Sequence, residues 1–406
     1  MPDKINEQYE AYPYPSRTAD EETTRLIQGS PSDIHEINHY LFAGKRDWSQ
    51  PFRALFAGGG TGDGLIQCTQ QLAWENCPAE IIYLDMSVAS RKIAEARANA
   101  RGLSNIHFET DTLLNAKAYG PFDYIDCCGV LHHLEDPLAG FNALHRSLAP
   151  GGGLGIMVYG RLGRTGVYEA QDMLKMLTQN TSLAASVETA KRFLDALPDT
   201  NWLKRNISIG DYKTGDAGLV DLLLHGRDRA YSVNEFCDSL MQSGLDLISF
   251  IEPDRYRPEF YTQDPALLEG LTLLSAQERM SFSEQFAGNL KVHIAYVAPS
   301  KGSDGRKAKP GPKMIPIPHR IDMAALSQTA RSGKPIGLTF DGLTVHLRLP
   351  PNASAILKLI DGKRCLEEIM HLTGQSDWIT FSRDFKAVYE PLNGINKLLL
   401  RQSAKR

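Results

Sequence analysis

Glycines in the segment RALFAGGGTGDGLIQ (53–67) are spaced in a way that leaves room for a ligand close to the backbone. Gly58, Gly60 and Gly62 form a G-x-G-x-G pattern directly after an apolar run and before a sequence that suits a helix. The first strand-to-helix turn of a parallel sheet is where nucleotide-like ligands approach. No register of the loop gives the G-x-G-x-x-G of dinucleotide-binding turns or the motif of triphosphate-binding loops. The pattern disfavours NAD, FAD and ATP, and a plain tight turn is the alternative to a ligand site.

Two acidic residues end later apolar runs and extend this pattern. Asp85 ends EIIYLD (80–85), 23 positions after Gly62, where a carboxylate can accept both hydroxyl protons of a ribose. Asp111 follows NIHFE (105–109) and is in position to meet an adenine edge. Because Asp at a strand end also caps helices, an N-cap role is the alternative for each residue. With the glycine loop beside it, we favour the ribose interpretation for Asp85.

Strand-like and helix-like segments alternate around these residues and must bring them to one edge of a sheet. Five apolar runs separated by segments able to form helices predict a parallel sheet covered by helices on both faces. They are RALFA, EIIYLD, NIHFE, FDYIDCC (122–128) and LGIMVY (154–159). LDLISFIEP (245–253) and NLKVHIAYVAP (289–299) offer two further strands.

Residues 53–159 resemble the core of class I S-adenosylmethionine-dependent methyltransferases. The segments that carry the resemblance are LFAGGGTGDG, YLDMS, ETDTL, FDYIDCCGVLHHLEDP and LAPGGGLGIMVY. The resemblance implies an α/β fold with a Rossmann-like seven-stranded sheet whose last strand is antiparallel, S-adenosyl-L-methionine as the cofactor, and in-line methyl transfer as the reaction. It also implies a set of cofactor-binding residues: Ala57, Gly58, Gly60, Gly62, Asp85, Met86, Asp111, Thr112, Cys128 and Gly129.

One position departs from the family pattern. Families of this type carry an acidic residue two places before the first glycine, and that position here is Phe56. The cofactor's ammonium group is thereby left without its usual partner. The segment after 122–128 also lacks the Asn/Asp-Pro-Pro-aromatic pattern of enzymes that methylate amino groups of bases and amides, which disfavours adenine or cytosine as the acceptor.

His132 and His133 are the predicted catalytic residues. They follow the strand-like run 122–128, beside the expected sulfonium, and imidazole titrates near neutral pH. Either side chain could therefore take a proton from an acceptor. Packing against or capping the next helix is the alternative, and we expect it for at least one of the two.

Two regions outside the sheet are predicted to bind the acceptor. The stretch YEAYPYPSR (9–17), within an N-terminal arm over 1–50, combines three tyrosines and two prolines and would close over the site as a lid. Residues 160–235 are too long for a sheet connection and predict a helical cap with Arg227 in its polar lining. The predicted substrate-binding residues are Tyr12, Tyr14, Tyr168, His225, Arg229 and Tyr231.

Charge divides the chain near residue 300. Residues 301–406 contain 18 Lys and Arg and nine Asp and Glu, a net charge of +9, which leaves −13 for residues 1–300. SKGSDGRKAKPGPK (300–313) has the composition of a solvated linker. We therefore expect a methyltransferase domain over 51–300, with the cap inside it, a linker over 301–313 and a basic module over 314–406.

The basic module contains LTFDGLTVHLRLPPNASAILKLIDGKRCLEEIMHLTG (338–374), which predicts a hairpin turning at Asp341 and Gly342 and then short helices. It resembles small α+β winged-helix modules of the peptide-recognising type and the regulatory tails of some bacterial protein methyltransferases. Its charge suits an acidic peptide, with nucleic acid as the less favoured partner. Docking on the acidic first domain is the alternative.

Composition limits the compartment and the chemistry. The sequence has neither an apolar run of ~18 residues nor an N-terminal signal segment, which predicts a cytoplasmic protein without a membrane partner. Its six cysteines include no C-x-x-C pair, and we predict no metal site. The predicted function is methyl transfer from S-adenosylmethionine to a small molecule or a polypeptide side chain. The alternative is a cofactor-sensing regulatory or binding protein with a degenerate methyltransferase fold. The acceptor, the methylated atom and the oligomeric state do not follow from these patterns.

Overall fold

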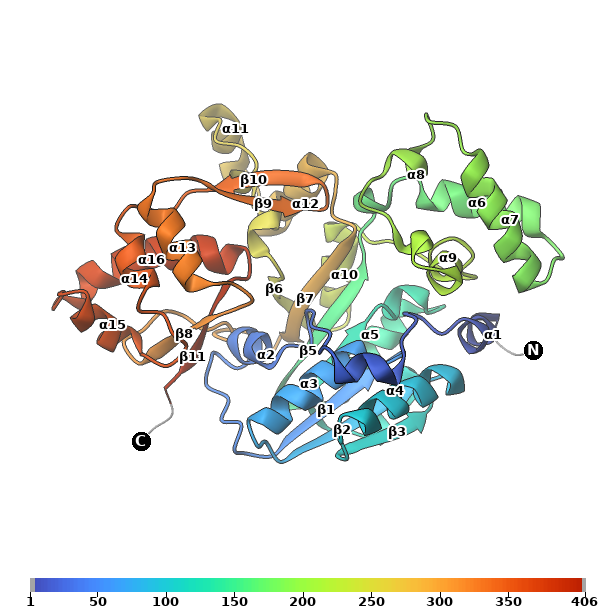
Figure 1. Ribbon diagram of the computed structural model, residues 1–406, viewed down its shortest axis with the longest axis horizontal. Coiled ribbons are helices and arrows are strands. Elements are labelled where there is room, and N and C mark those ends of the chain that lie inside the picture. The colour runs from blue at the N-terminus through green and yellow to red at the C-terminus, as the bar shows by residue number, and fades with distance from the viewer. Residues whose placement is uncertain (1–3, 404–406) are drawn as a thin grey trace. The chain divides into compact units, whose positions relative to one another are not determined.

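The computed structural model describes residues 4–403 and contains a seven-stranded sheet with the order β3-β2-β1-β4-β5-β7-β6 (Figure 1). β1 pairs in parallel with β2 and β4, β2 pairs with β3, and β4 pairs with β5. The strands are β1 (Phe52–Ala57), β2 (Ala79–Asp85), β3 (Ile106–Thr110), β4 (Phe122–Cys128), β5 (Leu148–Tyr159), β6 (Leu245–Phe250) and β7 (Val292–Pro299). The predicted Rossmann-like sheet of seven strands is confirmed.

The inner strands are apolar throughout because both faces of the sheet are covered. Leu55, Leu84 and Ile125 are fully buried in β1, β2 and β4. Helices α3 (Asp63–Trp74) and α4 (Val88–Ala100) lie in front of this part of the sheet in Figure 1. α5 (Pro137–His145) follows β4, and its N-cap is Asp136, whose side chain accepts the Ala139 N–H at 3.1 Å. Each strand therefore ends in a turn that delivers its last residues to the same edge.

The described chain divides into two compact units that do not follow the predicted boundary at residue 300. Of the described residues, the first contains 4–33, 48–245 and 288–294, and the second contains 34–47, 246–287 and 295–403. Residues 34–47 thus leave the predicted N-terminal arm and cluster with the C-terminal part of the chain, and so do 246–287. The basic tail is therefore one portion of a larger unit, and residues 34–47 contact it through His39, whose Nδ1 accepts the Leu400 N–H at 2.9 Å.

Helices of the predicted cap form their own small core in the first unit. Val167, Leu174 and Leu223 are among its fully or nearly fully buried residues. The helices are drawn in green and gather together in Figure 1. They are α6 (Val167–Thr178), α7 (Leu183–Ala196), α8 (Trp202–Arg205) and α9 (Asp216–Leu223), and α10 (Val233–Gln242) follows them.

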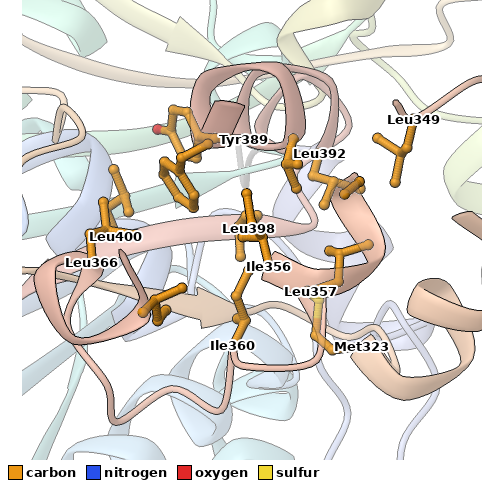
Figure 2. Packing of buried hydrophobic residues seen from close by; sticks show 14 of the residues in the cluster. Met323, Leu349, Ile356, Leu357, Ile360, Leu366, Tyr389, Leu392, Leu398 and Leu400 are labelled. Atoms are coloured by element: carbon orange, nitrogen blue, oxygen red, sulfur yellow. The ribbon is translucent and has the colours of Figure 1, made fainter. Parts of the chain in front are cut away.

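The second unit is built around an apolar cluster that joins helices and a two-stranded sheet (Figure 2). Leu392 and Leu398 lie at its centre with Ile356 and Leu357 beside them, and all four are at most 2% exposed. A separate hairpin turns at Asp341 and Gly342, between β9 (Ile336–Phe340) and β10 (Leu343–Leu347), as predicted. The elements are α2 (Ile34–Leu41), α11 (Pro265–Gly270), α12 (Ala276–Ala287), β8 (Met314–Pro318), α13 (Met323–Arg331), β9 (Ile336–Phe340), β10 (Leu343–Leu347), α14 (Ala353–Leu357), α15 (Leu366–Leu372), α16 (Trp378–Gly394) and β11 (Leu398–Gln402).

Residues 301–313 contain no helix or strand and are largely exposed, and part of the segment packs against the second unit. Ala308 is 3% exposed and belongs to the apolar cluster of the second unit. Its N–H donates to the His39 carbonyl at 2.7 Å, and the Ala43 N–H donates to the Arg306 carbonyl at 2.6 Å. Burial lowers the pKa of Lys307 to about 8. The aliphatic part of a lysine side chain can cover apolar surface, so a Lys-rich composition alone does not distinguish an exposed linker from a segment that packs against a core. The winged-helix interpretation of the module stays a prediction.

Within residues 4–403, no helix combines the length and apolar character that crossing a lipid bilayer requires.

Candidate functional site

A cavity of about 410 Å³ lies in the first unit, and the carboxyl ends of β1, β2 and β4 all reach it. Its wall has two chemically different sides. What we call the glycine side consists of residues directly after strands, and it comprises Gly58, Gly60, Gly62, Asp85, Met86, Asp111 and Thr112. What we call the histidine side is polar and aromatic, and it comprises Tyr9, His133, Tyr159, Asp221 and Arg227.

The glycine loop is tight for two different reasons. Gly60 has a φ of +52°, and a Cβ there would lie 3.3 Å from the carbonyl oxygen of Tyr14. Gly58 has a φ of +70°, and a Cβ there would lie 2.4 Å from a methyl group of Val130. The backbone of the N-terminal arm and the chain after β4 therefore both come close to this loop. What remains between them is a narrow cradle lined by backbone, which suits a ligand that approaches N–H groups.

Asp85 lines the cavity and also holds the loop. Its carboxylate accepts the Gly60 N–H at 2.8 Å and the Ser87 N–H at 2.8 Å. The N-cap of α4 is Ser87, whose Oγ accepts the Ser90 N–H at 3.0 Å. Burial raises the pKa of Asp85, and the two backbone hydrogen bonds oppose that rise. The N-cap role therefore belongs to Ser87, whereas Asp85 both lines the cavity and holds the loop.

Asp111 and Thr112 also line the cavity, and each has a local partner. Asp111 accepts Asn115 Nδ2 at 2.9 Å and the Thr112 N–H at 2.8 Å, and these hydrogen bonds lower its pKa. Thr112 is the N-cap of a short 3₁₀ helix, η2 (Leu113–Ala118), and accepts the Leu114 N–H at 3.3 Å. The helix N-cap, which was the alternative role considered for Asp111, is therefore Thr112.

The other predicted cofactor residues divide between the cavity wall and the core. Met86, Cys128 and Gly129 line the cavity. Ala57 is not among the lining residues and is 1% exposed within β1. Burial raises the pKa of the Cys128 thiol, so this sulfur faces the cavity as a neutral group.

The two predicted catalytic histidines have different environments. His133 lines the cavity, whereas His132 lies behind it, fully buried against the ring of Tyr159 at 3.9 Å between centroids. Neither ring nitrogen of His132 has a hydrogen-bond partner among the described residues. His133 Nδ1 lies 2.9 Å from the Arg227 carbonyl. Because a carbonyl only accepts, Nδ1 carries the proton and Nε2 keeps a lone pair, for which no partner is found among residues 4–403.

Most of the predicted substrate residues do not reach the cavity wall. Tyr14 does, through the N-terminal arm. His225 stacks on His133 with 3.8 Å between ring centroids and accepts the Arg227 N–H through Nδ1 at 3.0 Å. Arg229 is exposed, and the remaining three pack in the cap or beside the sheet: Tyr12, Tyr168 and Tyr231. His225 is thus a supporting residue behind His133, and Tyr14 is the predicted residue that contributes directly.

Sequence analysis missed the centre of the histidine side. Asp221 is 4% exposed, and its two oxygens accept the hydroxyls of Tyr9 and Tyr159 at 3.0 and 3.1 Å. Burial raises the pKa of Asp221 to about 6, whereas it lowers that of His133 to about 4. Tyr9 and Asp221 are 212 positions apart, so no local pattern connects them. Of these residues, Tyr159 could have been identified from the sequence as a cavity residue, because it ends a predicted strand.

The arm is fixed over the glycine loop by ion pairs. Arg17 donates to both oxygens of Asp63, at 2.9 Å from Nε and 2.7 Å from Nη2. Arg97 is fully buried and donates to the Thr61 carbonyl at 2.7 Å and to Glu22 at 2.8 Å. The predicted lid therefore has a built attachment to the loop that it covers.

Two groups of side chains are close enough to share a metal ion. His133, Asp221 and His225 place possible ligand atoms within 4.8 Å of one another, and so do His132, His133 and Asp228. In the first group, Tyr9, Tyr159 and the backbone of residue 227 already bind the Asp221 and His225 atoms. The geometry of the first group is therefore accounted for by protein hydrogen bonds, whereas both ring nitrogens of His132, Nε2 of His133 and Oδ1 of Asp228 in the second group have no hydrogen-bond partner among the described residues. The absence of a metal stays a prediction.

Comparison with known proteins adds an independent finding. Residues 55–154 match a protein-family model described as a methyltransferase domain. The chain is 31% identical over 276 residues to an uncharacterized protein of Synechococcus sp., and the match covers 64% of this chain and 63% of that protein. The chain thus spans less than two thirds of the length of this curated relative.

Two solved structures share the fold over nearly the whole chain. PKMT2 from Rickettsia typhi superposes with a TM-score of 0.64 at 16% identity, covering 97% of this chain and 78% of that one. The same protein in complex with AdoHcy gives 0.63 at 16% identity, covering 96% and 78%. This likeness includes residues from both compact units. The chain therefore carries a methyltransferase domain with the fold of class I, the S-adenosylmethionine-dependent methyltransferases.

Proposed function

We propose that this protein transfers a methyl group from S-adenosylmethionine to a nucleophile held on the histidine side of the cavity. The observation that carries the proposal is that one cavity joins both sides, so that a ligand on the glycine loop and an acceptor near His133 would share a single space. The family match and the AdoHcy complex of the structural neighbour support the choice of cofactor.

The cradle fits this cofactor by its chemistry. Asp85 retains acceptor capacity for ribose hydroxyls, and Gly60 leaves no Cβ where the arm passes. The bound cofactor would supply a methyl group already activated by a positive sulfur. The protein's part is then to align the acceptor with that methyl group and to exclude water.

The histidine side offers a proton acceptor and an orienting frame. Nε2 of His133 is buried and has no hydrogen-bond partner among the described residues, and a pKa lowered to about 4 keeps the ring neutral near pH 7. It can therefore take the proton that a hydroxyl, thiol or amine acceptor loses as the methyl group arrives. Stacking on His225 and the bond to the Arg227 carbonyl fix the ring plane.

Tyr9, Tyr159 and Asp221 then frame the acceptor. Both tyrosine hydroxyls donate to the same carboxylate, and all three residues line the cavity. We propose a small molecule or a polypeptide side chain as the acceptor, and we do not favour nucleic acid. The second unit, with its basic tail, is a candidate for recognition of an acidic peptide.

A labelled-methyl experiment tests the function. The purified protein is incubated with methyl-labelled S-adenosylmethionine and a cell extract, and label is followed into small molecules and, by protease sensitivity, into polypeptides. Label in either fraction, lost in the Gly60→Val variant, is the expected result. Binding of S-adenosylhomocysteine without any transfer would instead support the cofactor-sensing alternative.

A further inference from the structure

Phe56 occupies the place where this class of enzyme carries an acidic residue, and the neighbouring strand supplies a carboxylate beside it. Phe56 lies in β1 and its register partner on β4 is Asp126. Paired residues on adjacent parallel strands project to the same face of a sheet. Both residues line the cavity. The acid absent from one strand is therefore present one strand away.

Asp126 is built to hold a charge against the cavity. It is 4% exposed, and its Oδ2 accepts Ser32 Oγ at 2.7 Å and the Tyr124 hydroxyl at 3.2 Å. Both bonds go to the same oxygen, so among residues 4–403 no hydrogen-bond donor is paired with Oδ1. Burial raises the pKa of Asp126 to about 6, and the bonds from Ser32 and Tyr124 oppose that rise. No cationic side chain contributes to this shift, so the ionised group lacks a counter-charge.

The other carboxylates of the cavity are already engaged. Asp63 is paired with two arginines, Asp85 accepts two backbone N–H groups, Asp111 accepts donors from its own turn, and Asp221 accepts two tyrosine hydroxyls. In contrast to these carboxylates, Asp126 has one oxygen, Oδ1, that accepts no hydrogen bond from the described residues, and Asp126 is not part of the histidine side. A buried carboxylate of this kind favours a cation in the space it faces.

We propose that Asp126 binds the α-ammonium group of the cofactor, in place of the acidic residue that Phe56 replaces. This inference rests on the proposed function, because it takes S-adenosylmethionine as the ligand. Ser32, from the N-terminal arm, and Tyr124 hold the carboxylate in position through Oδ2. The glycine loop and Asp85 then bind the nucleoside, while Asp126 fixes the amino-acid end.

Binding measurements with two ligands test the assignment. S-adenosylhomocysteine carries the α-ammonium group, whereas 5′-methylthioadenosine shares its nucleoside and lacks the amino-acid end. In calorimetry, we expect Asp126→Asn to bind S-adenosylhomocysteine about 10- to 100-fold more weakly and methylthioadenosine as the unchanged protein does. Tyr124→Phe removes one donor to the same carboxylate but keeps its charge, and serves as the matched control with a smaller loss.

Measurements on the unchanged protein cover the case in which Asp126→Asn does not fold. S-adenosylhomocysteine affinity should fall between pH 7.5 and pH 5, as Asp126 becomes protonated, whereas affinity for the analogue that lacks only the α-amino group should not show this extra loss.

Equal losses for both ligands, or an Asp126→Asn variant with an unchanged ratio of the two affinities, would overturn the assignment. A loss for S-adenosylmethionine but not for S-adenosylhomocysteine would place the carboxylate at the sulfonium and also overturn it. Failure of the unchanged protein to bind either nucleoside would refute the proposed function itself.

Discussion

The two sides of the cavity are built from different kinds of sequence. The glycine side consists of residues that follow β1, β2 and β3 within 55 positions of one another, from Gly58 to Thr112. The histidine side joins Tyr9 of the arm, Tyr159 at the end of β5 and Asp221 of α9. A ligand cradle can thus be made by one local pattern repeated along a parallel sheet, whereas the histidine side requires segments that only the fold brings together.

This contrast predicts that damage to the glycine side removes cofactor binding, while damage to the histidine side removes turnover and leaves binding intact. The largest effect is expected for Gly60→Val, which should abolish binding of S-adenosylhomocysteine. A branched side chain opposes the φ of +52° and would press on the Tyr14 carbonyl. Calorimetry measures the loss.

Gly102→Val is the matched control for Gly60→Val. Gly102 also has a positive φ, of +69°, but a Cβ there meets nothing within 4 Å, and the residue does not line the cavity. This variant should lose some stability and keep its affinity. Retained affinity in Gly60→Val would show that the loop glycines serve only the turn.

On the histidine side, His133→Asn should lower the rate of methyl transfer by ~10²- to 10⁴-fold with cofactor affinity unchanged, because a positioned proton acceptor contributes about that much. The asparagine amide can replace Nδ1 as the donor to the Arg227 carbonyl, so the change removes Nε2 alone. Incorporation of labelled methyl at saturating cofactor measures the rate.

His133→Gln is the reciprocal change, because its longer side chain reaches the position of Nε2 and loses the bond to residue 227. If His133→Asn were as active as the unchanged protein and His133→Gln were inactive, His133 would be a positioning residue. Another group on the histidine side would then have to accept the proton.

A smaller effect is expected at Asp85. Asp85→Ala should weaken S-adenosylhomocysteine binding by about 1.5 to 3 kcal/mol, as expected for the loss of a charged hydrogen bond to the ribose. The Gly60 and Ser87 N–H groups lose their acceptor as well, so the melting temperature should fall slightly. A large fall in melting temperature with unchanged affinity would assign Asp85 to support of the loop alone.

The smallest effects concern the pH dependence of stability, and Asp126 and His133 should respond with opposite signs. The pKa of Asp126 is raised to about 6, above ~3.9 in the unfolded chain, so the folded state binds more protons between these values and the free energy of unfolding falls as pH rises through them. The pKa of His133 is lowered to about 4, below ~6.5 when unfolded, so its contribution rises with pH over that window.

Thermal unfolding of two variants separates these contributions. From pH 4 to pH 7, the melting temperature of Asp126→Asn relative to the unchanged protein should rise, and that of His133→Asn should fall, each on the order of a few degrees. Other titrating groups are common to all three proteins and cancel in the differences. A shift of the same sign in both variants would contradict the assigned environments.

The fold of the first unit follows closely from local patterns. Alternation of apolar runs and helical segments predicted the order of β1 to β5, and the position of Asp85 at the end of its strand predicted that it would reach the cavity. These features depend on a few consecutive residues, because side chains alternate along a strand and each turn delivers the residues that follow it to the same edge.

Other features were decided by tertiary structure alone. The sequence contains Asp126, but only the register of β4 against β1, 70 positions apart, places it beside Phe56. Ala308 lies in a segment with the composition of a linker, yet it is buried in the apolar cluster of the second unit and donates its N–H to the His39 carbonyl. The amino-acid sequence by itself determined the sheet, the glycine cradle and the class of ligand, since their signals are periodic and local. Which buried groups face one another across the cavity depended on long-range packing, where the free energy comes from contacts that no window of consecutive residues contains.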